Sequence, residues 1–70
     1  MPSVRERLDV LDRQIEHARL AIDERRSLVR FMEQQGEDTA EVHRLLSHLQ
    51  QALDDMIQLR VEVKRDAQRL

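Results

Sequence analysis

Hydrophobic residues recur along this chain at alternating steps of three and four positions, and one glycine interrupts the series near its middle. Such steps make a seven-residue repeat, whose a and d positions share one side of an α-helix and pack against another helix. The repeat therefore predicts two long helices. In the first half the a and d positions hold Val4, Leu8, Leu11, Ile15, Ala18, Ile22, Val29 and Met32; in the second they hold Val42, Leu46, Leu49, Leu53, Met56, Val63, Ala67 and Leu70.

The ends of the first helix are marked by residues that cap helices. Ser3 and Glu6 form the S-x-x-E spacing of a capping box, in which the serine oxygen accepts a backbone N–H three residues on. Gly36 suits the left-handed position just past a helix, which glycine adopts at little steric cost. We therefore expect the first helix over about residues 4–35.

The second helix is expected to begin almost at once. Asp38 and Glu41 repeat the capping-box spacing, and either Asp38 or Thr39 can cap a helix over about residues 39–69. A turn over residues 36–38 is so short that the second helix must return antiparallel to the first. Folding at Gly36–Glu37 pairs Met32 with Val42, Ile22 with Leu53, Ala18 with Met56, Leu11 with Val63, and Val4 with Leu70.

Further hydrophobic residues widen the a/d stripe on one side of each helix. They occupy the g positions of the repeat, namely Ala21, Leu28, Leu45, Ala52 and Leu59. One helix pair cannot cover a stripe of three positions, whereas a four-helix bundle can. We expect an all-α antiparallel two-helix hairpin, coiled-coil-like, and two such hairpins should form a homodimeric four-helix bundle. The alternatives are a higher oligomer, a partner helix from another protein, and a monomer. Leu20 and Phe31 could extend the contact surface.

The size of the chain favours self-association, and its composition argues against several classes of protein. A domain of 70 residues buries a small core, and with no cysteine it cannot use disulfides. Phe31 is the only aromatic residue, so an aromatic platform for single-stranded nucleic acid is disfavoured. The sequence has no apolar run of about 20 residues, which a membrane span needs, and no signal peptide. The expected location is cytoplasmic, away from membranes.

Two arginines, Arg25 and Arg60, are the only residues that break the a/d series. A cation in a helix seam is costly unless it is solvated or paired. Each can lay its methylene groups along the seam and extend the guanidinium to the edge, or fix the helix register, or bind an anion or a partner. The expected register places Arg60 within reach of Asp12 or Glu16, and Arg25 near Gln50.

Residue patterns that carry catalysis or metal binding are missing from the sequence. His43 and His48 are five positions apart and diverge on a helix, and adjacent acids such as Asp54 and Asp55 diverge as well. The serines and the threonine lack a glycine-flanked nucleophile elbow. We therefore expect no enzyme activity, no metal, no cofactor and no small-molecule substrate.

Charge is distributed unevenly between the two ends of the expected hairpin. The turn end holds Glu33, Glu37, Asp38 and Glu41. The open end holds Arg5, Arg7, Lys64, Arg65 and Arg69, partly offset by Glu6, Glu62 and Asp66. A basic end can contact phosphate, but the net charge of −2 argues against a nucleic-acid binder.

The stretch from Ile15 to Arg60 resembles a family of short uncharacterised alpha-proteobacterial proteins. The shared features are a helix rich in Arg and Glu, a Gly-x-Asp-Thr turn and a Leu-rich second helix. In this chain they are the first helix, then Gly36-Glu37-Asp38-Thr39, then Ala40-Glu41 and Leu45-Leu46. The resemblance implies a bacterial helical hairpin and brings no activity, since none is known for the family.

Two other hairpin families supply alternative functions. Rop-type RNA-binding regulators are similar in architecture, and Phe31 is the one candidate for their exposed phenylalanine. Spo0E-like aspartyl-phosphate phosphatases are similar in Gln50-Gln51-Ala52-Leu53-Asp54, which keeps the glutamine, leucine and aspartate of their motif but lacks its serine and glutamate. That resemblance implies that Gln51 and Asp54 face a response regulator. The residues themselves favour a non-enzymatic interaction protein.

Overall fold

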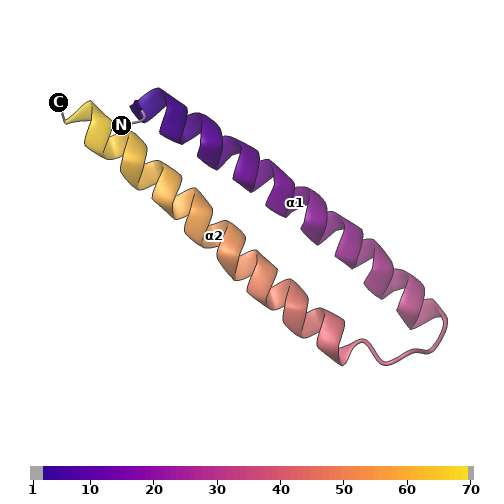
Figure 1. Ribbon diagram of the computed structural model, residues 1–70. Helices are drawn as coiled ribbons and strands as arrows, with labels where there is room; N and C mark the ends of the chain where they lie inside the picture. Colours follow the sequence, from indigo (N-terminus) through magenta and orange to yellow (C-terminus); the bar gives the residue numbers. More distant parts are fainter. Residues whose placement is uncertain (1–2, 70) are drawn as a thin grey trace.

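A computed structural model describes residues 3–69, and within them it shows two helices joined by a short connection. Helix α1 spans Val4–Gln34 and helix α2 spans Ala40–Gln68. The two helices lie side by side and antiparallel, so that the beginning of α1 and the end of α2 meet at one end of the molecule (Figure 1). The predicted all-α hairpin is confirmed. The expected pairing of Val4 with Leu70 lies outside the described residues.

The first turn of α1 is capped by a side chain. Ser3 has an extended backbone, and its Oγ accepts a hydrogen bond from the Glu6 N–H at 3.1 Å. This contact satisfies one of the N–H groups that lack partners at the start of a helix. The serine half of the predicted capping box is therefore present.

The end of α1 is closed by backbone hydrogen bonds around Gly36. This glycine has a φ of 72°, in the left-handed region that the sequence predicted for it. The Glu37 N–H donates to the Met32 carbonyl at 2.9 Å, and the Gly36 N–H donates to the Glu33 carbonyl at 3.1 Å. These two bonds make a Schellman motif, which turns the chain sharply out of the helix.

Of the two residues expected to cap α2, Asp38 makes the hydrogen bond, although it does not occupy the cap position. Thr39 occupies the cap position, but its side chain makes no capping hydrogen bond. Instead, Asp38 Oδ1 accepts a hydrogen bond from the Ala40 N–H at 3.0 Å. Asp38 therefore bonds two residues ahead, as in an Asx-turn, because it lies one residue before the helix cap.

The core is a single row of side chains between the helices. Its buried members all belong to the predicted a and d positions: Leu11, Ile15, Ile22, Val29, Leu53 and Val63. Ile15, Ile22 and Leu53 form the central cluster, and Ala18 and Met56 pack against it. The pairing of Ile22 with Leu53 and of Ala18 with Met56 agrees with this cluster.

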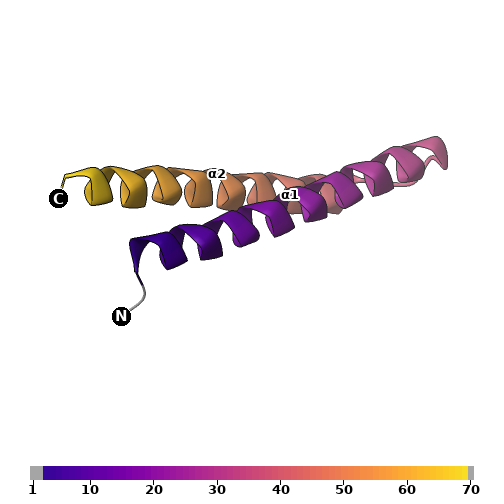
Figure 2. The same cartoon turned by 90° about the horizontal axis from the view of Figure 1, so that it is seen from above.

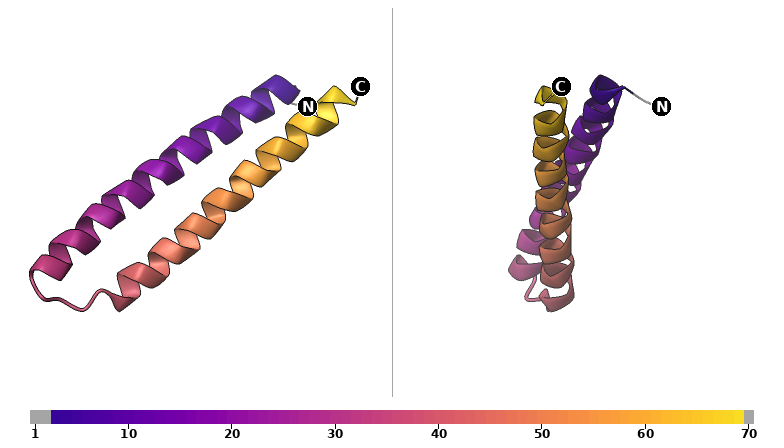
Figure 3. Two further views of the ribbon diagram at one scale, coloured as in Figure 1. Left: turned by 180° about the vertical axis from the view of Figure 1, so that it is seen from behind. Right: turned by 90° about the vertical axis from the view of Figure 1, so that its left-hand side faces the viewer.

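The molecule is a thin rod. Its extents are 55 × 16 × 15 Å, and the helices cross at a shallow angle when the hairpin is viewed along its plane (Figures 2 and 3). No residue in the described range has a side chain that is fully enclosed. Between residues 3 and 69, neither helix has both the length and the apolar character needed to cross a membrane.

Candidate interaction faces

The rod has two long faces of different chemistry, which flank the buried seam. One of them, termed the polar face, carries the side-chain contacts between the helices. The polar face comprises Asp12, Arg26, Glu33, His43, Gln50 and Arg60. Apart from Arg60, a seam residue, these residues occupy e positions of the repeat, and e positions of antiparallel helices face each other.

The closest of these contacts joins Arg60 of α2 to Asp12 of α1. Arg60 Nε donates to Asp12 Oδ1, and Arg60 Nη2 donates to Asp12 Oδ2 at 3.5 Å. The hydrogen bond from Arg60 lowers the pKa of the Asp12 carboxyl, and the same bond raises the pKa of the guanidinium. The expected contact between Arg60 and Asp12 is therefore present. The seam arginine directs its charge to the polar edge.

Two weaker contacts continue the polar face toward the turn. Arg26 Nη2 donates to Gln50 Oε1 at 3.4 Å, and Gln50 Nε2 donates in turn to Asp54 Oδ1 at 3.0 Å. His43 Nε2 lies 3.5 Å from Glu33 Oε1, with both side chains more than half exposed. Solvent screens pairs of this kind, so they contribute mainly to register.

Arg25, the other seam arginine, differs from Arg60. Its side chain is half-buried, and the neighbour that the sequence analysis expected for it, Gln50, contacts Arg26 instead. The reason is positional, because Arg26 occupies the e position that faces Gln50 across the edge. Whether Arg25 sets specificity stays a prediction.

Replacing Asp12 by Asn is expected to lower stability at neutral pH and to flatten its acid dependence. Because the pKa of Asp12 is lowered, the pair stabilises the fold at pH values above the ordinary 3.8 and loses this contribution as pH falls through the lower folded value. Urea unfolding at about pH 6 and pH 2.5 should show a larger difference between native and D12N at the higher pH. D23N, on the exposed outer side of α1, is the matched control. An equal difference at both pH values would contradict the ion pair.

The opposite face, termed the apolar face, exposes the g positions. Leu28, Leu45 and Leu59 are 47%, 42% and 45% exposed, although leucine is among the residues most often buried. Ala21 is half-buried, and Ala52 is exposed between them. These are the five residues predicted from the sequence to form an interface, and α1 and α2 both contribute to the face.

Two further exposed residues lie on the same side of α1. Val10 and Phe31 occupy c positions, which adjoin the g positions around a helix, and they are 42% and 57% exposed. Phe31 therefore extends the apolar face at its turn end, next to Leu28. No basic side chain occupies the neighbouring g and c positions of its half of α1.

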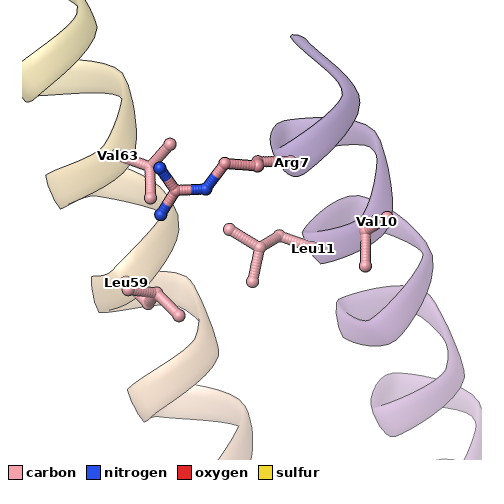
Figure 4. A pocket seen from close by; sticks show the side chains of 5 residues that line it. All are labelled: Arg7, Val10, Leu11, Leu59 and Val63. Carbon is pink, nitrogen blue, oxygen red and sulfur yellow. The ribbon is translucent and has the colours of Figure 1, made fainter. Parts of the chain in front are cut away.

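The apolar face is hollowed at its open end. A hollow of about 280 Å³ lies between the helices, lined by Arg7, Val10, Leu11, Leu59 and Val63. Leu11 and Leu59 point toward the space between α1 and α2, and Arg7 reaches across from α1 toward Val63 (Figure 4). A cavity of roughly 150 Å³ is enough to hold benzene, so the hollow can admit an aromatic or branched side chain.

The remaining candidate residues lie apart. Within residues 3–69, no three His, Cys, Asp or Glu side chains converge where they could hold a metal ion. Gln51 and Asp54 are both exposed, and Gln51 Nε2 donates to Asp55 Oδ1 at 3.0 Å. This bond follows the ordinary helix spacing of four residues.

Comparisons with protein-family models, with curated proteins and with solved structures found no match for this chain. The resemblance to the alpha-proteobacterial hairpin family therefore stays an expectation. Function has to be argued from the two faces.

Proposed function

We propose that this chain is a non-enzymatic helical interaction module that self-associates through the apolar face into a four-helix bundle. The observation that carries the proposal is the row of exposed leucines at Leu28, Leu45 and Leu59, which both helices present on one side. Contiguous apolar surface of this kind marks interaction sites in proteins that fold in water.

The exposed area supports the same proposal. The chain exposes 5702 Å², whereas a monomer of 8.4 kDa is expected to expose only about 4,600 Å². The excess of about 1,100 Å² is comparable to the roughly 800 Å² that each partner buries in a standard interface. The thin rod shape causes this excess, and pairing two rods side by side removes it.

A second copy is the occupant that fits the face best. The apolar residues lie at matching levels on the two helices, since Ile22 and Leu53 share one core cluster and Ala21 and Ala52 precede them. A face built evenly from both helices suits another hairpin, which presents two helices, better than a single helix. The polar face, by contrast, has its side chains engaged within the chain.

Light scattering over a concentration series, with helicity followed at the same dilutions, tests the proposal. We expect a molar mass near twice 8.4 kDa at high concentration and a loss of helicity as the dimer dissociates. A stable helical monomer at all concentrations would contradict self-association.

A further inference from the structure

We propose that two copies pack their apolar faces in antiparallel orientation, so that the turn end of each hairpin lies on the open end of the other. This inference rests on the proposed self-association and adds its geometry. Two features of the apolar face support it: the relief of the surface and the position of the small residues.

The relief differs between the ends of the face. The turn end carries Leu28, Phe31 and Leu45, termed the raised cluster. Phe31, at 57%, is the most exposed of these, whereas Leu28 and Leu45 are about as exposed as Leu59 beside the hollow. The open end carries the hollow beside Leu11 and Leu59. When the raised cluster of one copy packs into the hollow of the other, the two surfaces are complementary. Packing turn end against turn end would instead place the two raised clusters on each other and leave the two hollows facing each other.

The alanines lie midway between these features. In α2, Leu45 and Leu59 are each seven residues from Ala52. In α1, Phe31 and Leu11 are each ten residues from Ala21, or about 15 Å along the helix. A two-fold axis at the level of the alanines therefore seats the raised cluster of each copy in the hollow of the other at once. Small residues on the axis let the two pairs of helices approach closely.

This symmetry is that of a closed dimer. The two-fold rotation sets α1 against α1 and α2 against α2 of the second copy, with both pairs antiparallel. Both raised clusters are then covered, and the same surface serves on each copy, as an isologous interface requires. No end of the face is left to add a third hairpin.

Distances between spin labels in the full-length dimer test the orientation. The chain has no cysteine, so Q34C or Q51C labels one exposed site on each copy. Gln34 is thirteen residues from Ala21, so antiparallel packing separates the two labels by at least about 39 Å along the rod. Gln51 adjoins Ala52, so its two labels stay within about 30 Å, across the bundle.

A long distance at Gln34 with a short one at Gln51 is the expected result of electron–electron double resonance. Short distances at both sites would overturn the antiparallel orientation but would still show that the chain forms a dimer. Long distances at both sites would overturn the axis at the alanines. Molar mass measured on the labelled proteins separates these outcomes from failure of self-association itself, because a monomer gives no distance and overturns both proposals.

Discussion

Replacing Ile22 by Ala is expected to lower the free energy of unfolding by about 2–4 kcal/mol. Ile22 is the most buried side chain of the described core, at 3% exposure, and it lies in the central cluster with Ile15 and Leu53. The total free energy of unfolding of a domain of this size is about 3–10 kcal/mol. The substitution should therefore remove a large share of its stability, and urea unfolding followed by circular dichroism measures the change.

The matched control for this prediction is two residues away on the same helix. Leu20 is 52% exposed on the outer side of α1, so L20A is expected to change the free energy of unfolding by less than about 0.5 kcal/mol. Both variants must be compared at one protein concentration, since association adds to apparent stability. Equal losses in the two variants would mean that the core does not lie where the structure places it.

Replacing Leu28 by Glu is expected to dissociate the proposed dimer. The substitution places a carboxylate in the apolar face, and the symmetry of the dimer repeats it, so two charges lose water without a partner. At a cost of about 1.5 kcal/mol for each copy, the dissociation constant should rise by more than about 100-fold. Light scattering should then report a monomer at concentrations where the native chain is a dimer.

L20E is the control for this prediction, because it adds the same charge to an exposed leucine on the outer side of α1. We expect its dimer to persist with little change in affinity. If L28E remained dimeric and L20E dissociated, the interface would lie on the outer side of α1 and the apolar face would be left without its proposed role.

The seam and the turn could be predicted because they depend on local rules. Each buried residue, such as Leu11 or Val63, occupies an a or d position that spacing alone identifies. Gly36 takes its left-handed conformation because the chain must leave one helix and enter another within a few residues. Arg60 could be placed near Asp12 because the short turn fixes the register.

The contrast between the two faces was only partly predictable. The g positions showed that the stripe is wide, and Phe31 was named as a residue that could extend it, but Val10 was not, although a helical wheel places c beside g. The hollow beside Leu59 could not be predicted, because it depends on how the helices cross and on where Arg7 extends. The sequence could not decide which residue caps α2, because Asp38 and Thr39 are both of types that cap helices.

The position of the helix ends has a consequence for anything joined to this hairpin. The start of α1 and the end of α2 lie at one end of a rod 55 Å long (Figure 1). In the proposed antiparallel dimer those ends would fall at opposite ends of the bundle. Proteins fused at residue 3 or residue 69 would therefore be held apart by about the length of the rod. The dimer would act as a rigid spacer whose two ends are chemically identical and point away from each other.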